Sequence, residues 1–164
     1  MVISQGFAAV ARTDARILIL GSMPGVASLE ATQYYAFPRN AFWKIMGELF
    51  NAGTDLEYEQ RLIKLTHQHI ALWDVIASCQ RPGSLDSAIS KDGLTTNDFC
   101  GFLEKHPGIK HIYFNGQKAA TLFKKRVEPD LSRQFEYRTL PSTSPAYAAK
   151  SYAEKLQAWS VIKT

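Results

Sequence analysis

Four short apolar segments are spread along the chain, and each has the composition of a strand in a covered sheet. They are residues 16–20, 70–76, 109–114 and 135–140. Gly21 and Pro24 close the first segment, which is typical of a buried strand that ends in a loop. The fourth segment is the most polar, so we expect it at an edge of the sheet.

Apolar residues at helical spacing fill the intervals between these segments. The pattern predicts helices over 42–50, 55–67, 96–105 and 147–163, a helix through 119–123, and a short one over 85–90. Thr95 and Asp98 have the spacing of a capping box, which would open the helix over 96–105. The loop 81–84 is the one interruption of the alternation.

Strands that alternate with helices predict an α/β protein, because helical crossovers are right-handed and must shield both faces of a sheet. The expected architecture is a three-layer α/β/α sandwich with a central, mainly parallel four-stranded sheet. A length of 164 residues suits one buried core. We therefore expect a single domain over 1–164.

Composition excludes several classes of protein. No stretch reaches the roughly 18 to 20 apolar residues of a membrane helix, and the first residues lack the pattern of a targeting segment. We expect a monomeric, cytoplasmic protein that does not contact a membrane. Cys79 and Cys100 match no metal-ligand spacing, so no metal and no cofactor are expected.

The net charge of +4 is distributed unevenly along the sequence. Residues 101–164 contain 11 basic and 5 acidic side chains, whereas residues 1–100 contain 8 and 10. A basic excess favours a polyanion such as nucleic acid. A solvated lysine face explains the same excess, and the run 124–126 is most simply a helix end stabilised by the helix dipole.

Candidate binding residues follow the predicted strands, where an open parallel sheet binds its ligands. Gly21 and Gly25 allow close backbone approach, so amides near Ser22 and Met23 can point at a ligand, although an ordinary turn has the same composition. The turn contains neither a dinucleotide-binding nor a P-loop pattern, which argues against both kinds of nucleotide site.

Two further loops carry polar groups, each with a structural alternative. Asn115 directly follows the third segment and can offer a donor and an acceptor to a base edge, but Asn-Gly is also a common turn pair. Residues 141–145 combine three hydroxyls with two prolines, which suits either a phosphate or a helix cap. Tyr34 and Tyr35 lie among polar residues, so one of them can stack on a flat ligand, whereas Phe42 and Trp43 suit the core.

Taken together, these segments resemble the uracil-DNA glycosylase superfamily, and most closely its hypoxanthine (deoxyinosine) DNA glycosylase branch, often called family six. The resemblance rests on residues 21–25, 34–43, 73–75 with 81–86, 115–119 and 140–146, which occur in the family's order. It extends from about Arg16 to the last helix. It implies an enzyme that flips a damaged base out of DNA and hydrolyses its N-glycosidic bond without a metal or cofactor.

The resemblance also implies roles for individual residues. Asn40 is the expected catalytic residue, and Ser22 stands where the mismatch-specific uracil branch has a water-positioning asparagine. Met23, Tyr35 and Asn115 form the expected base-binding set, with Tyr35 stacking on the base and Asn115 reading its edge. The expected DNA-binding loop consists of Pro141, Ser142, Thr143, Ser144, Pro145 and Ala146. Phe37 departs from the family, which has histidine before its Pro-Arg-Asn segment.

Three functions remain open from the sequence. The leading hypothesis is a monofunctional glycosylase that removes hypoxanthine, with uracil as the nearest alternative base. Ser22 and Phe37 leave room for a DNA-binding protein of the same fold that has lost catalysis. A small-molecule enzyme on a flavodoxin-like sheet is disfavoured by the missing phosphate-binding patterns.

Overall fold

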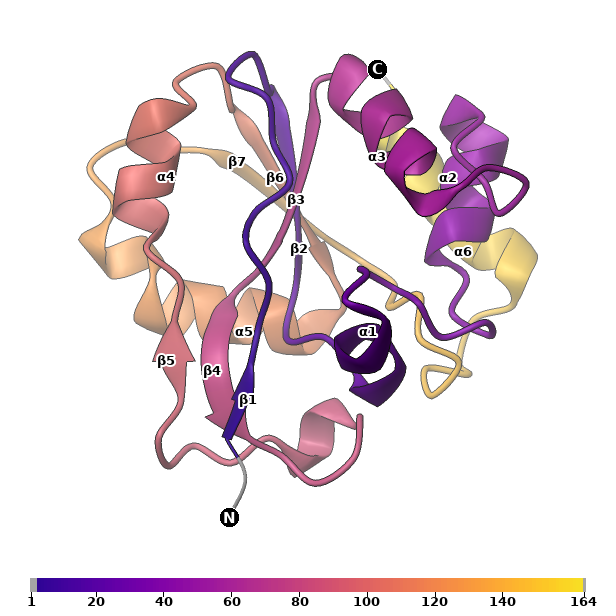
Figure 1. Ribbon diagram of the computed structural model, residues 1–164. Coiled ribbons are helices and arrows are strands. Elements are labelled where there is room, and N and C mark those ends of the chain that lie inside the picture. The colour runs from indigo at the N-terminus through magenta and orange to yellow at the C-terminus, as the bar shows by residue number, and fades with distance from the viewer. Residues whose placement is uncertain (1–2, 164) are drawn as a thin grey trace.

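The computed structural model describes residues 3–163, and its centre is a four-stranded parallel sheet (Figure 1). The strands lie in the order β3-β2-β6-β7. Their bounds are Ile17–Gly21 for β2, Ile70–Asp74 for β3, His111–Asn115 for β6 and Glu136–Leu140 for β7. All three pairings are parallel, and the polar β7 lies at an edge. The predicted fold class is therefore confirmed.

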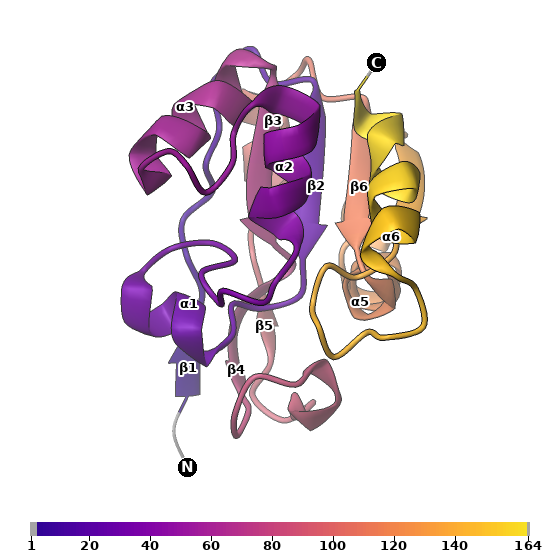
Figure 2. The same ribbon diagram turned by 90° about the vertical axis from the view of Figure 1, so that its right-hand side faces the viewer.

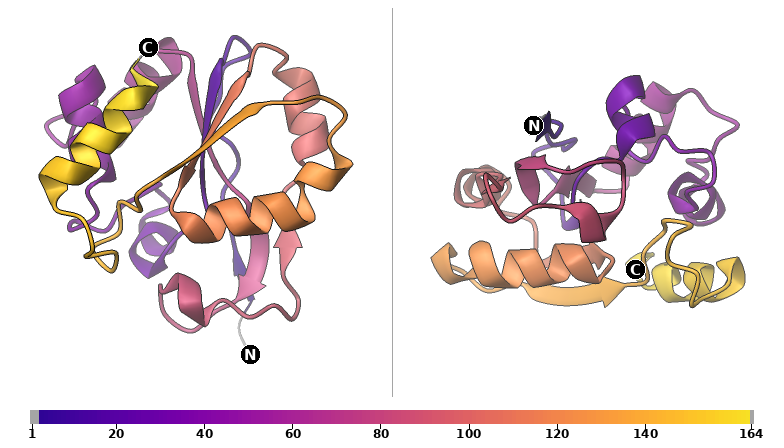
Figure 3. Two further views of the ribbon diagram at one scale, coloured as in Figure 1. Left: turned by 180° about the vertical axis from the view of Figure 1, so that it is seen from behind. Right: turned by 90° about the horizontal axis from the view of Figure 1, so that it is seen from below.

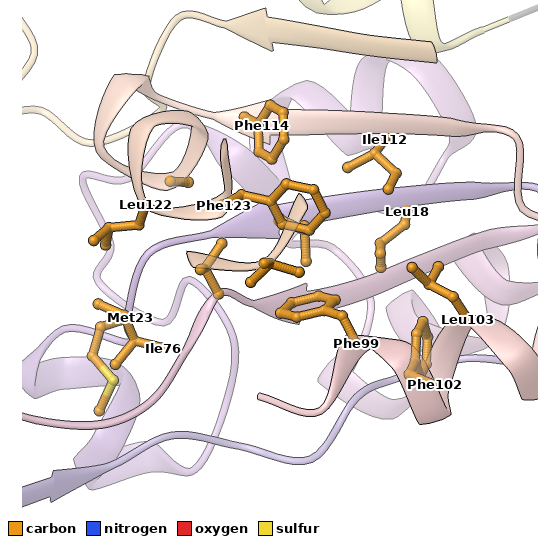
Figure 4. Close-up of a cluster of buried hydrophobic side chains, with 14 of the residues drawn as sticks. Leu18, Met23, Ile76, Phe99, Phe102, Leu103, Ile112, Phe114, Leu122 and Phe123 are labelled. Atoms are coloured by element: carbon orange, nitrogen blue, oxygen red, sulfur yellow. The ribbon is translucent and has the colours of Figure 1, made fainter. Parts of the chain in front are cut away.

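Helices cover both faces of this sheet because alternate strand residues point to opposite sides. Leu18 and Leu20 pack with α4 and α5 in one apolar cluster, part of which Figure 4 shows. Ile17 and Ile19 pack with α2, α3 and α6 in the other cluster. Figure 2 shows the second set of helices from its own side. The bounds are Phe42–Phe50 (α2), Tyr58–His67 (α3), Phe99–Lys105 (α4), Gln117–Arg126 (α5) and Tyr152–Trp159 (α6).

A second, three-stranded sheet was not predicted. It pairs β1 (Ile3–Gln5), β4 (Ile76–Gln80) and β5 (Thr95–Thr96) in antiparallel fashion, in the order β1-β4-β5. The predicted strand over 70–76 is therefore wrong at its end, because β3 stops at Asp74 and the chain enters β4 after Val75. Apolar residues continue through this break, so hydrophobicity alone does not reveal it.

Several predicted helices begin later than expected. The helix expected at 55 begins at Tyr58, and the helix expected at 147 begins at Tyr152, after a capping box formed by Ser151 and Glu154. The predicted Thr95 capping box is wrong, because Thr95 belongs to β5 and Asp98 itself caps α4 by accepting the Gly101 N–H. The expected short helix over 85–90 is a 3-10 turn, η1, which covers only Asp86–Ala88.

Four short elements complete the connections. Helix α1 (Val26–Ala31) follows β2, η1 covers Asp86–Ala88, and two further 3-10 turns cover Glu128–Asp130 (η2) and Ser160–Ile162 (η3). None of the helices in residues 3–163 has the length and hydrophobicity that a membrane span requires.

The carboxyl ends of the parallel strands lie together at the lower end of the central sheet in the view of Figure 1 and in the left panel of Figure 3. Gly21 pairs with Asp74 across β2 and β3, and Asn115 pairs with Leu140 across β6 and β7. Leu20 pairs with Phe114, which places Gly21 and Asn115 in the same row. The loops that leave this row therefore converge.

Candidate active site

A cavity of about 860 Å³ lies at this end of the sheet. Its walls come from the turns after β2, β6 and β7, from the end of β3, from α1, from the segment before α2 and from the loop that contains η1. The predicted site residues that line it are Ser22, Met23, Tyr35, Asn40, Asn115, Ser142, Thr143, Ser144, Pro145 and Ala146. Pro141 precedes this wall and accepts a hydrogen bond from the Trp159 indole, at 2.9 Å. The fold thus brings the predicted residues to one place.

Gly21 is needed in the floor of the cavity because its neighbours occupy the space of a side chain. A Cβ atom at this position would lie 2.5 Å from Asp74 Oδ1 and 2.9 Å from the Tyr35 hydroxyl oxygen. Both distances are too short for a carbon atom. The absent side chain lets a carboxyl group and a phenol meet above the end of β2.

Ser22 is already engaged in a hydrogen bond. Its hydroxyl donates to Asp86 Oδ1 at 2.5 Å, and the residue is 7% exposed. Arg81 donates to the Pro24 carbonyl oxygen, and Ser84 Oγ accepts the Val26 N–H at 2.8 Å. The turn after β2 is therefore fixed from outside by the loop that contains η1.

Asn40 stands at the entrance to α2, where its two amide atoms differ in their surroundings. Its Oδ1 accepts the Phe42 N–H at 2.9 Å, which holds the first turn of the helix. Within residues 3–163, its Nδ2 has no hydrogen-bond acceptor. The next residue, Ala41, donates its N–H to the Thr143 carbonyl oxygen at 3.0 Å, which joins this segment to the loop after β7.

The two tyrosines before α2 have different environments. Tyr34 is 3% exposed and donates its hydroxyl proton to the Ala8 carbonyl oxygen at 2.8 Å, so it belongs mainly to the core. Tyr35 adopts a left-handed backbone (φ 56°), and its ring stacks on Phe42 with centroids 4.0 Å apart. Burial raises the pKa of the Tyr35 hydroxyl, as does the nearby Asp74 carboxyl. Phe37 is 44% exposed at the rim.

Asn115 and Thr143 form a two-point bridge between the ends of β6 and β7. Asn115 Nδ2 donates to Thr143 Oγ1, and Asn115 Oδ1 accepts the Thr143 N–H, both at 2.9 Å. A hydrogen bond from the Asn115 amide also lowers the pKa of the Tyr35 hydroxyl, although burial outweighs it. The amide is thus held by protein groups, and the role of Asn115 as reader of the base stays a prediction.

The loop after β7 uses its own hydroxyls to hold its backbone. Ser142 Oγ accepts the Ser144 N–H, and Ser144 Oγ accepts the Ala146 N–H, both at 3.2 Å. The ammonium of Lys155, which is 5% exposed, donates to the Ser144 carbonyl oxygen at 3.1 Å. Burial lowers the pKa of this lysine. The loop is therefore rigid, but fewer of its amides are free than the sequence suggested.

Three acidic residues that line the cavity, Glu30, Asp74 and Asp86, were not among the predicted site residues. Asp74 ends β3, is 3% exposed, and has a buried Oδ2 without a hydrogen-bond partner within the described part of the chain. Burial and, to a smaller extent, the Asp86 carboxylate raise the pKa of Asp74, Arg81 opposes the rise, and the resulting pKa is about 7. The sequence signal that could have identified Asp74 as a site residue is an acidic side chain near the end of a predicted buried strand.

No cluster of three or more histidine, cysteine or acidic side chains that could hold a metal ion occurs within residues 3–163. The basic run 124–126 forms the exposed last turn of α5 and does not line the cavity.

A parallel sheet that ends in a cavity, with buried amide, hydroxyl and carboxyl groups beside an aromatic ring, is an arrangement typical of proteins that bind a small polar ligand. Comparison with known proteins specifies the class. The model of the Uracil DNA glycosylase superfamily matches residues 8–163. The chain belongs to this superfamily.

Individual relatives cover most of the chain. The chain is 40% identical, over 147 residues, to a protein of Methanosarcina acetivorans named hypoxanthine DNA glycosylase, with 88% of this chain and 89% of the relative covered. It is 36% identical, over 146 residues, to a protein of the same name from Methanosarcina barkeri, with 87% of each covered. A solution NMR structure of a Methanosarcina acetivorans protein, provisionally named a uracil DNA glycosylase, covers 99% of this chain and 100% of its own at 34% identity, with a TM-score of 0.76.

Proposed function

We propose that the protein is a monofunctional DNA glycosylase, which flips a deaminated base out of DNA and hydrolyses its N-glycosidic bond in base excision repair. Hypoxanthine is the proposed principal base, and uracil is the second. The observation that carries the proposal is a single cavity that joins Asn40, Tyr35 and Asn115 beside the loop 141–146. The names of the two Methanosarcina relatives support the choice of base. We further propose that the enzyme acts as a cytoplasmic monomer.

Base flipping places a purine in the cavity, where Tyr35 supplies a stacking surface. One face of the Tyr35 ring already packs on Phe42, so only the opposite face is left for the base. Stacking on an aromatic ring stabilises an extruded base by about 1–3 kcal/mol. Phe37, at the rim, is placed to contact a neighbouring nucleotide rather than the flipped base.

Asn40 is the proposed catalytic residue, and its free Nδ2 is the group that acts. The bond from Phe42 N–H to Oδ1 fixes the orientation of the amide, so Nδ2 can donate to the attacking water or to the sugar. Cleavage of a glycosidic bond passes through a positively charged sugar, which weakens the requirement for a strong base. Orientation of the water then supplies the rate, as in other preorganised sites.

The loop 141–146 is the proposed phosphate grip. Its internal hydrogen bonds and its ties to Asn115 and Lys155 hold it rigid before DNA arrives, so little further ordering is needed on binding. Contacts to phosphate position the duplex without reading its sequence.

A panel of duplexes tests the proposed function. Duplexes that contain a single hypoxanthine, uracil or unmodified adenine are incubated with the protein in excess and with a metal chelator, and the released base is measured by chromatography. We expect release of free hypoxanthine with an abasic site, slower release of uracil and no release of adenine. DNA binding without release of any base would instead favour a catalytically inactive binding protein.

A further inference from the structure

Asp74 is a buried acid that the proposed roles of Asn40, Tyr35 and Asn115 leave unused. It lies in the cavity at the carboxyl end of β3, with its Oδ1 next to Gly21 and its buried Oδ2 unpartnered within residues 3–163. A buried polar atom without a partner is uncommon in proteins, and together with its place in the cavity it makes Asp74 a candidate for a role in the chemistry of the site.

The charged groups around Asp74 favour its neutral, protonated form. Asp86 faces it from η1, and Tyr34 and Tyr35 face it from the segment before α2. Arg81 is the nearby cation, but its guanidinium donates to the carbonyl oxygens of Pro24 and Ser84 instead of to the Asp74 carboxyl. With burial as the largest cause, the pKa of Asp74 rises to about 7. A substantial fraction of the carboxyl therefore holds a proton at neutral pH.

A purine leaving group offers an acceptor for that proton. In a hypoxanthine nucleotide, N9 is bonded to the sugar and N1 holds a hydrogen, so N3 and N7 are the ring nitrogens with free lone pairs. N7 lies in the same five-membered ring as N9, and its protonation draws electrons away from the glycosidic bond. Proton transfer by a positioned acid accelerates reactions by about 10²- to 10⁴-fold.

We propose that Asp74 is the general acid of the reaction and donates its carboxyl proton to N7 of the departing purine. This inference rests on the proposed glycosylase function. The N9–C1′ bond breaks with its electron pair going to the base, while the O–H bond of Asp74 breaks and an N7–H bond forms. Neutral hypoxanthine leaves, water adds its hydroxyl to C1′, and the remaining proton of water passes to solvent, from which the Asp74 carboxylate is protonated again.

The proposal makes a prediction about the choice of base. Uracil has no atom equivalent to N7, so Asp74 accelerates the release of a purine and not that of the pyrimidine. Adenine also has an N7 acceptor, which means that Asp74 does not distinguish hypoxanthine from adenine. Protein groups that contact the edge of the six-membered ring must distinguish hypoxanthine from adenine.

The test compares wild type with Asp74→Asn by single-turnover release of hypoxanthine between pH 5.5 and 9. The acid form of Asp74 is lost as the pH rises through about 7, so the wild-type rate should fall above that pH, approaching tenfold per pH unit. Asp74→Asn should be about 100-fold slower at pH 6 and independent of pH in this range. Asp92→Asn, an exposed aspartate outside the cavity, should behave as wild type.

A second substrate tests the acceptor atom. A duplex with 7-deazainosine, in which carbon replaces N7, should bind as tightly as the inosine duplex and react at least 100-fold more slowly with wild type. An unchanged rate for Asp74→Asn on inosine DNA, or equal wild-type rates on the two duplexes, would overturn the proposal. Folding of the variant is checked by its thermal unfolding and its affinity for DNA. Absence of hypoxanthine release by wild type at every pH would instead refute the proposed function itself.

Discussion

Replacement of Asn40 by alanine should lower the single-turnover rate of hypoxanthine release by about 100- to 1,000-fold, which is the usual effect of removing one positioned donor from an active site. The reason is the free Nδ2, whose orientation is fixed by the bond from Phe42 N–H to Oδ1. Affinity for inosine-containing DNA should change little, because the side chain acts on the chemical step and not on phosphate.

Two control variants separate this role from stability. Asn40→Ala also removes the hydrogen bond to the Phe42 N–H, and loss of a helix-capping bond costs about 0.5–2 kcal/mol of stability. Asn40→Ser keeps a capping oxygen but lacks the amide, so it should fold normally and still be slow. Ser22→Ala should cost less than Asn40→Ala, because the Ser22 hydroxyl is already bonded to Asp86. Wild-type turnover by Asn40→Ser would remove Asn40 from the mechanism.

Asp74→Asn should make the protein more stable, by an amount that increases with pH. The pKa of Asp74 rises from 3.8 to about 7 on folding, so ionisation favours the unfolded state. The wild-type free energy of unfolding should therefore fall, relative to that of the variant, as the pH rises from about 4 to about 7, and the difference should then remain constant. A shift of about 3 pKa units corresponds to about 4 kcal/mol.

Urea denaturation of both proteins at several pH values measures this difference. The variant has no titrating group at position 74, so subtraction cancels the contributions of the other groups. Asp92→Asn, as an exposed control, should give a difference close to zero. A constant difference between wild type and Asp74→Asn from pH 4 to pH 8 would show that Asp74 titrates normally and would also weaken its assignment as the general acid.

The architecture could be predicted because its signals are local. Alternating apolar strands and amphipathic helices define the central sheet and its two covering layers, and the polar β7 was correctly expected at an edge. The small second sheet gave no such signal, since β1 and β5 are two or three residues long and contain serine, glutamine or threonine. Its pairings join residues far apart in sequence, for example Ser4 with Cys79.

The site, too, could be predicted only where its signals are local in the sequence. Polar residues directly after a predicted strand, such as Asn115, could be placed at the ligand end of the sheet, and the structure puts them in the cavity. Asp74 was missed because apolar Val75 and Ile76 extend the segment beyond it, so the predicted strand did not end there. The hydrogen-bond partners of the side chains could not be predicted from the sequence either. Asn115 bonds to Thr143, 28 residues away, and Ser22 bonds to Asp86, 64 residues away.

The most direct test of the account is the structure of the protein bound to a duplex that contains 2′-fluoro-deoxyinosine, in which the fluorine slows cleavage. We expect the hypoxanthine ring to lie inside the cavity on the free face of Tyr35, with its sugar next to Asn40 Nδ2 and its N7 within hydrogen-bond distance of Asp74. The loop 141–146 should contact the phosphates that flank the base. A base that stays stacked in the duplex, with the DNA bound to a surface away from the cavity, would contradict the account.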